Sequence, residues 1–178
     1  MERKMIATSA IKLISRRAVL QLSLFGVSSA LLSQPLQAAS RTTAPVITVW
    51  KTPSCGCCKA WVAHLRQNGF EVVTNDVSDT SAVRKKFDFP DQYGSCHTAK
   101  LGEYVLEGHV PAEDIRKLLQ DKPPARGLAV PSMPLGSPGM EGVGPYAGVR
   151  HAYNVLLVLN DGSSRVFKSY AAISSNKS

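Results

Sequence analysis

The residues best suited to chemistry in this sequence are its cysteines. Three of the four lie within four residues, as Cys55, Cys57 and Cys58, and the fourth, Cys96, follows in a later segment. The thiolate form of cysteine attacks disulfides and binds metal ions. This pattern therefore predicts either a soft-metal site or a redox site.

The elements around the three clustered cysteines favour reactive thiols. Residues 46–51 form an apolar run typical of a buried strand, and residues 57–68 have the periodicity of a helix. The cysteines then lie at a helix N-terminus, where free N–H groups and the positive end of the helix dipole favour thiolate. Lys51 and Lys59 add positive charge nearby and would offset the charge of several thiolates.

A thiol–disulfide oxidoreductase is one hypothesis. Cys55 and Cys58 form a C-x-x-C pair, in which Cys55 would be the exposed nucleophile and Cys58 the resolving thiol. Two features count against it. The motif contains a third cysteine, Cys57, which invites scrambling, and Cys96 has no role in a two-thiol cycle.

A metal site would use all four cysteines. Thiolates are soft donors, and soft donors select Cu(I) most strongly. The adjacent Cys57 and Cys58 point apart and cannot easily chelate one small ion, but thiolates can bridge ions, which favours a multinuclear copper site. A single Cys₄ zinc site is an alternative, although zinc sites usually space their cysteines as separate C-x₂₋₄-C pairs. Structural disulfides are disfavoured, because a domain of this size needs none.

Three further residues are candidate ligands or partners of the ligands. His97 is adjacent to Cys96, and imidazole suits copper; the alternative is a turn residue bonded to the backbone. Met133 and Met140 offer soft thioethers, and the alternative is packing on the core. His109 precedes a predicted helix and is expected to cap or pack rather than to bind.

The first 38 residues predict an export signal peptide. A basic start is followed by an uncharged apolar stretch over 18–32 and a small residue, Ala38, suited to cleavage. Arg16 and Arg17 also resemble a twin-arginine signal, so the route is left open between Sec and twin-arginine export. We expect a periplasmic protein without a membrane span once the leader is removed.

The charge of the remaining chain gives little support to nucleic-acid binding. The leader holds five of the 21 Lys and Arg residues and one of the 13 Asp and Glu residues, so the rest carries a net charge of +4. Its longest basic run, 84–86, fits the solvated face of a helix.

The order of predicted elements indicates an α/β, thioredoxin-like fold, with a central mixed sheet flanked by helices. After a tether at 39–45, one domain is expected over 46–171, followed by a polar tail at 172–178. The long Pro/Gly-rich segment 122–149, in which 12 of 28 residues are Pro or Gly, is expected to be a loop. The remaining expected elements are strands at 70–77 and 100–107, helices at 81–87 and 111–120, and a hairpin of 153–159 with 164–170.

Several motifs together resemble one protein family. They are Cys55-x-Cys57-Cys58 after Trp50-Lys51-Thr52-Pro53, Tyr93-x-x-Cys96-His97-Thr98, Glu107-Gly108-His109-Val110-Pro111-Ala112, and the stretch from Gly127 to Met140. The family is domain of unknown function 411, the CopG-type proteins of bacterial metal-resistance operons, and the resemblance covers residues 46–158. It implies a periplasmic, thioredoxin-like copper-binding protein whose ligands are the four cysteines. Copper redox activity is a further implication.

The sequence hypothesis is thus a periplasmic Cu(I)-binding protein of copper resistance, holding more than one copper ion through Cys55, Cys57, Cys58 and Cys96. Expected partners are copper ions and a periplasmic copper chaperone or efflux system. The alternative is a thiol–disulfide oxidoreductase using Cys55 and Cys58. Whether the protein is an enzyme stays open between these hypotheses.

Overall fold

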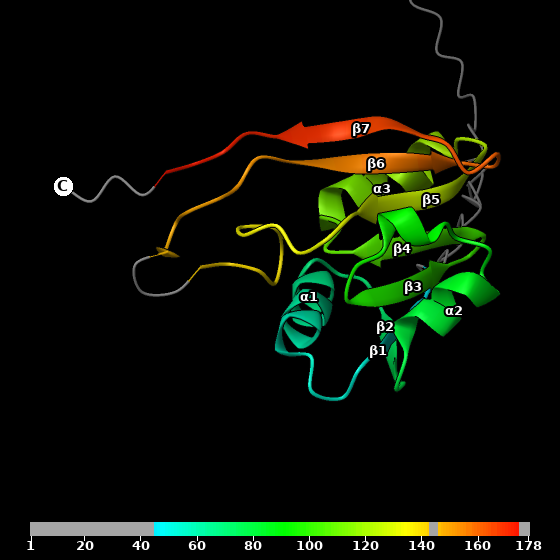
Figure 1. Cartoon of the computed structure of the whole chain (residues 1–178), viewed down its shortest axis with the longest axis horizontal. Coiled ribbons are helices and arrows are strands. Elements are labelled where there is room, and N and C mark those ends of the chain that lie inside the picture. The colour runs from blue at the N-terminus through cyan, green and yellow to red at the C-terminus, as the bar shows by residue number, and fades with distance from the viewer. Residues whose placement is uncertain (1–44, 143–145, 175–178) are drawn as a thin grey trace, which may run out of the picture. The chain divides into compact units, whose positions relative to one another are not determined.

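The computed structural model describes residues 45–142 and 146–174. The predicted leader 1–38, nearly all of the tether 39–45 and the end of the tail 172–178 lie outside the described residues. Figure 1 shows the arrangement of the helices and strands. They are, in chain order, β1 Ile47–Lys51, α1 Gly56–Gln67, β2 Val72–Asp76, α2 Thr80–Lys86, η1 Asp91–Tyr93, β3 His97–Leu101, β4 Tyr104–Gly108, α3 Ala112–Asp121, β5 Ala125–Val130, β6 Tyr153–Leu159 and β7 Ser164–Tyr170.

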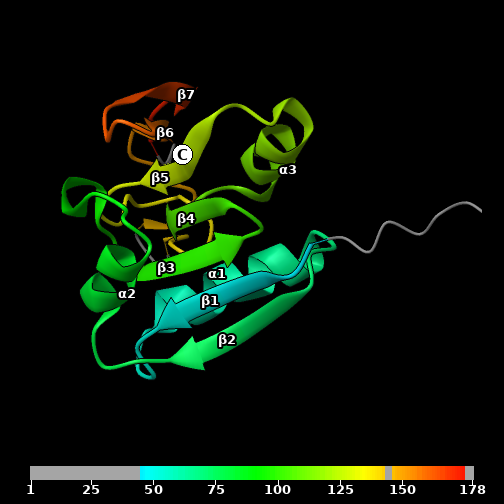
Figure 2. The ribbon, with the colours of Figure 1, turned by 90° about the vertical axis from the view of Figure 1, so that its right-hand side faces the viewer.

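The seven strands form one mixed sheet in the order β2-β1-β3-β4-β5-β6-β7. The pairs β1–β2 and β4–β5 are parallel, and all other neighbours are antiparallel. The β1-α1-β2 unit followed by the β3-β4 hairpin and α3 gives the core of a thioredoxin-like fold, and β5, β6 and β7 extend its sheet (Figure 2). The predicted fold class is confirmed.

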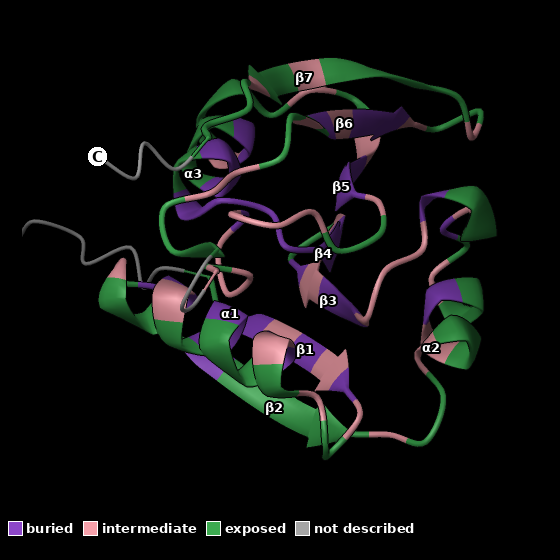
Figure 3. Ribbon diagram, turned by 60° about the vertical axis from the view of Figure 1, so that its left-hand side comes forward, coloured by how far each residue is buried: buried purple, intermediate pink, exposed green. Residues whose placement is uncertain are grey.

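The main core lies between one face of the sheet and the helices α1 and α3. Trp61 and Leu65 of α1, together with Ile115 and Leu118 of α3, are fully buried there. A smaller cluster, which includes Phe89, packs elsewhere against β4, β5 and β6. Burial of one such apolar side chain stabilises the fold by about 1.5–3 kcal/mol. Figure 3 shows the central strands largely buried and the edge strands β2 and β7 largely exposed.

Two sequence predictions are wrong. The single strand expected at 100–107 is a hairpin, β3 and β4, because a turn at Gly102 and Glu103 interrupts the apolar run. The segment 125–130, expected to be a loop, is β5, a strand paired on both sides. Its pairing partners come from distant parts of the chain, so its Pro-rich surroundings gave a misleading signal.

The C-terminal hairpin of β6 and β7 is confirmed at its predicted bounds. Because β5 takes up part of the Pro/Gly-rich segment, the expected loop begins only after Val130. We call residues 131–142 the strap. Within 45–142 and 146–174, no helix has the length and apolar character needed to cross a membrane.

Candidate metal centre

The first turn of α1 presents three cysteines. The Cys55 N–H donates to the carbonyl of Thr52 at 3.2 Å, which closes the turn after β1. Cys55 is the N-cap residue of α1, and its Sγ accepts the N–H of Cys58 at 3.2 Å. Because the helix begins at Gly56, Cys57 and Cys58 lie in its first turn, where the helix dipole favours negative charge.

The fourth cysteine comes from the segment that leads into β3. Since β3 pairs with β1, with His97 opposite Lys51, Cys96 is brought beside the start of α1. Its Sγ lies 3.8 Å from the Sγ of Cys57, which lies 3.5 Å from the Sγ of Cys55. All four sulfur atoms lie within 4.8 Å of one another. The structure therefore brings together the four cysteines that the sequence hypothesis grouped.

The structure also contains a disulfide between Cys55 and Cys58, and Cys57 and Cys96 are free thiols. The sequence analysis disfavoured structural disulfides, whereas this bond joins the outer pair of the C-x-x-C motif. The pair is the one that the oxidoreductase alternative requires. Cys58 is buried and Cys55 is half-buried, so Cys55 is the more accessible of the two sulfurs.

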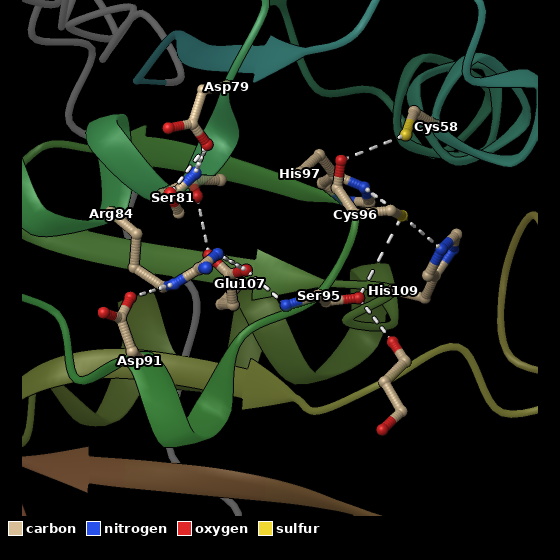
Figure 4. A network of polar contacts seen from close by, with 12 residues as sticks. Cys58, Asp79, Ser81, Arg84, Asp91, Ser95, Cys96, His97, Glu107 and His109 are labelled. Atoms are coloured by element: carbon tan, nitrogen blue, oxygen red, sulfur yellow. Dashed lines mark hydrogen bonds and ion pairs between the residues drawn. The ribbon is translucent and has the colours of Figure 1, made fainter.

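Two buried histidines contact Cys96. Its Sγ lies 3.1 Å from Nε2 of His109 and 3.3 Å from Nδ1 of His97 (Figure 4). The other ring nitrogen of His109, Nδ1, lies 2.8 Å from the carbonyl oxygen of Pro138. A carbonyl only accepts, so Nδ1 carries the proton and the lone pair of Nε2 faces the sulfur. His97 Nε2 is buried without a hydrogen-bond partner among the described residues.

His109 is therefore a site residue that the sequence analysis missed. It was expected to cap a helix or to pack, whereas it contacts the thiol of Cys96. The hairpin that joins the two residues was read as a single strand, which would have placed His109 far from Cys96. Recognising the turn at Gly102 would have provided the missing signal.

Burial favours the uncharged forms of the Cys96 thiol and of the two imidazoles. Burial, and after it the neighbouring Cys57 sulfur, raises the pKa of the Cys96 thiol to about 12. Burial, followed by the proximity of His109, lowers the pKa of His97 to about 3, and burial lowers the pKa of His109. Without a bound cation, the site thus holds a neutral thiol against neutral imidazoles. A soft cation would supply the positive charge that a thiolate needs here.

The strap contacts each part of the site. The N–H of Ser132 donates to the carbonyl of Gly94 at 3.2 Å, and Pro138 accepts from His109. Gly139 adopts a φ of +83° and lies so close to α1 that an added Cβ would be 2.6 Å from the backbone nitrogen of Trp61. The strap thereby ties α1, the Cys96 segment and His109 together.

The two methionines of the strap differ from the cysteines. Met133 is half exposed and lines a cavity of about 480 Å³ together with His151. Met140 is partly buried, and its backbone bonds to Ser137 and Gly136 within the strap. Among the described residues, neither methionine makes a polar contact with a cysteine. Their role as copper ligands stays a prediction.

Trp61 shields the site on the side of the core. Its indole is fully buried, its ring centroid lies 4.3 Å from that of His97, and its Nε1–H donates to the carbonyl of Val110 at 2.8 Å. Lys51, expected to offset thiolate charge, instead pairs with Asp76 at 2.5 Å. The Lys51 ammonium group therefore has a carboxylate partner, and its role beside the thiolates stays a prediction.

Comparison with known proteins connects this site to a family. The profile of a family described as "Protein of unknown function, DUF411" matches residues 93–140, which include Cys96, His109 and most of the strap. No curated protein matches the chain. Two solved structures, described as "Copper resistance protein copG- Form 2" and "Copper resistance protein copG- Form 1", are similar to it. Each has 41% identity and a TM-score of 0.65, and each comparison covers 71% of this chain and 98% of that one. The chain therefore belongs to the family of the copper resistance protein CopG.

Proposed function

We propose that this chain binds Cu(I) through Cys55, Cys57, Cys58 and Cys96 and serves copper resistance in the periplasm. The observation that carries the proposal is the mutual approach of all four sulfur atoms within 4.8 Å. Thiolates are soft donors and prefer Cu(I) to harder cations. The relatives described as copper resistance proteins support copper as the metal.

The spacing of the sulfurs supports more than one copper ion. Three cysteines lie at the N-cap and in the first turn of α1, and the Cys57 sulfur lies near those of both Cys55 and Cys96. Thiolates that lie this close can bridge between ions, as proposed from the sequence. The lone pair of His109 Nε2 points at the Cys96 sulfur, and His97 Nδ1 lies beside the same sulfur. Both imidazoles therefore fit as additional copper donors.

Copper capture by all four cysteines requires reduction of the Cys55–Cys58 disulfide. That reduction takes up two electrons and two protons. In the reverse direction, oxidation of the two thiols to the disulfide releases two protons and two electrons, which would reduce two Cu(II) ions to Cu(I). We propose this exchange as the form that copper redox activity takes in this protein.

A thiol–disulfide oxidoreductase is the second candidate function. It is favoured by the disulfide at the N-terminus of α1 in a thioredoxin-like fold, with a half-buried Cys55 and a buried Cys58. The free Cys57, 3.5 Å from Cys55 Sγ, counts against it, because it can attack the same disulfide.

Metal competition on the exported protein tests the proposal. The protein is purified from the periplasmic fraction, reduced without oxygen and offered Cu(I) and Zn(II) together, and metal and free thiols are counted per chain. More than one copper per chain with no free thiol is expected. One zinc ion per chain, or no bound metal with the thiols still free, would reject the copper site.

The same periplasmic protein tests two further proposals, removal of the leader and transfer of copper to partner proteins. The mass of the periplasmic protein tests whether residues 1–38 are removed. A copper-transfer assay with periplasmic copper chaperones and with the periplasmic component of an efflux system tests the proposed partners. Recovery of the protein only in the cytoplasm would contradict the proposed location.

A further inference from the structure

A buried carboxylate lies next to the proposed metal centre. Glu107 is on β4, opposite Thr98 of β3, and its side chain has no exposed surface. It accepts three hydrogen bonds: from the N–H of Ser95 at 2.6 Å, from Oγ1 of Thr98 at 2.7 Å and from Nη1 of Arg84 at 2.8 Å (Figure 4). Three donors on one carboxylate fix its orientation.

Two of these donors, Ser95 and Thr98, flank Cys96, a proposed copper ligand, in the sequence. Ser95 immediately precedes Cys96, and Thr98 follows His97. One carboxylate therefore holds the segment that carries Cys96 at both of its ends. Figure 4 shows Glu107 and Ser95 on one side of Cys96 and His109 on another.

The same network reaches the strap and α2. The hydroxyl of Ser95 donates to the carbonyl of Ser132, so the residue that Glu107 orients also anchors the strap. Arg84 of α2 is itself buried, and it also pairs with the exposed carboxylate of Asp91 at 3.0 Å. Thus Arg84 remains partly neutralised even when Glu107 is altered.

A buried ion pair of this kind is a poor source of stability. Removal of two charges from water costs as much free energy as their attraction returns, and apolar residues of the same volume often stabilise a core equally well. The network has a clear consequence, however, for the position of Cys96. Groups that orient a metal ligand without touching the metal change its affinity for the metal.

We propose that Glu107 is a positioning residue that holds Cys96 within reach of Cys57 and His109. Its three hydrogen bonds fix the 95–98 segment, and through it the 3.8 Å and 3.1 Å contacts of the Cys96 sulfur. The copper readout of this inference rests on the proposed function, whereas its geometric readout does not.

Three substitutions separate charge from hydrogen bonding. Glu107→Gln keeps an oxygen that accepts from Ser95 and Arg84, and its amide N–H can donate to the Thr98 hydroxyl. Glu107→Leu removes all three bonds. Thr98→Val removes one bond, keeps the shape of the side chain and serves if the leucine variant does not fold. Leu118→Ala removes a buried apolar group of α3 and serves as a control for lost stability.

Two measurements are made on the exported protein. The first is hydrogen exchange of the Ser95 amide in the reduced, metal-free protein, which reads its bond to Glu107 directly. The second is Cu(I) affinity per folded chain, measured by competition with a chelator. For Glu107→Leu we expect fast Ser95 exchange and an affinity lower by about 10- to 100-fold. Thr98→Val should give an intermediate Ser95 exchange rate and an intermediate Cu(I) affinity. The Cu(I) affinities of Glu107→Gln and Leu118→Ala should stay within about threefold of the wild-type value.

Two outcomes would overturn the proposal. In the first, Glu107→Leu or, if it is unfolded, Thr98→Val leaves Ser95 exchange and copper affinity unchanged. In the second, Leu118→Ala and Glu107→Leu lower the melting temperature equally and also lower the Cu(I) affinity equally. If the wild-type protein binds no copper, the proposed function fails. Ser95 exchange in the metal-free variants then still decides the positioning role.

Discussion

The Nε2 atom of His109 lies 3.1 Å from the Sγ atom of Cys96, although the two residues are 13 positions apart in the chain. The β3–β4 hairpin explains the contact, because Cys96 immediately precedes β3 and His109 immediately follows β4. The two ends of an antiparallel hairpin meet at the same edge of the sheet. This hairpin therefore delivers a thiol and an imidazole to one point beside the N-terminus of α1.

The first prediction concerns this imidazole. His109→Leu should lower Cu(I) affinity by about 10- to 100-fold, whether the nitrogen binds copper or orients the thiolate. Competition with a Cu(I) chelator measures the change. His151→Leu is the matched control, because His151 is exposed and lies outside the polar contacts of the described cysteines. Equal losses in the two variants would contradict a specific role for His109.

The second prediction concerns the strap. Gly139→Ala should destabilise the protein for two reasons. Its φ of +83° is unfavourable for alanine by about 1–2 kcal/mol, and the new Cβ would be 2.6 Å from Trp61 N and 2.8 Å from Cys57 O. The clash should add about 1–3 kcal/mol. Chemical denaturation measures the loss.

Gly148→Ala is the control for this substitution. Gly148 has a φ of +76°, but an added Cβ there meets no atom within 4 Å. It should therefore show the cost of the backbone conformation without the clash. If both variants lose the same stability, the strap does not pack tightly on α1.

The elements that follow local rules could be predicted from the sequence. The strand β1, the helix α1 and the β6–β7 hairpin have clear apolar periodicity or turn residues, and their bounds agree closely with the prediction. Strand β5 could not be predicted in this way. Its pairing with β4 and β6 buries a short apolar run between Pro-rich segments, and only tertiary structure selects that pairing.

The misread hairpin also changed how the fold was interpreted. The expected elements held only one hairpin, 153–159 with 164–170, whereas β3 and β4 form a second hairpin that pairs with β1 and precedes α3. The fold class was still right, because the β1-α1-β2 unit was right. At the site, the four cysteines were grouped by their chemistry, but His109 and Glu107 depend on the register of β3 and β4, which the sequence alone does not give.

The third prediction separates the two candidate functions. Cys57→Ser leaves the Cys55–Cys58 pair intact, so a thiol–disulfide oxidoreductase should keep its full activity. A copper cluster that depends on Cys57, which lies between the sulfurs of Cys55 and Cys96, should lose at least about one copper ion per chain. Copper counting and an insulin-reduction assay on the same preparation measure both. Unchanged copper content with full reductase activity would support the oxidoreductase.

The final prediction concerns pH and the start of α3. The hydroxyl of Tyr170 lies 2.8 Å from Asp114 and 2.5 Å from Glu113, and its single proton can serve only one of them. Burial raises the pKa of Asp114, Glu113 raises it further, and the bond from Tyr170 and the charge of Lys168 lower it, with a net increase. A carboxyl whose pKa is raised on folding stabilises the protein below its unfolded pKa of about 3.9 and loses that contribution as the pH rises.

Asp114→Asn removes this titration while it keeps an oxygen for Tyr170. The melting temperature of the variant relative to wild type should therefore increase from about pH 4 to about pH 7, because the ionised carboxylate destabilises only the wild-type protein. Thermal unfolding at both pH values measures the difference, and Glu113→Gln shows whether the exposed neighbour contributes. A helix N-terminus favours negative charge, so the opposite trend would mean that the dipole of α3 outweighs burial at Asp114.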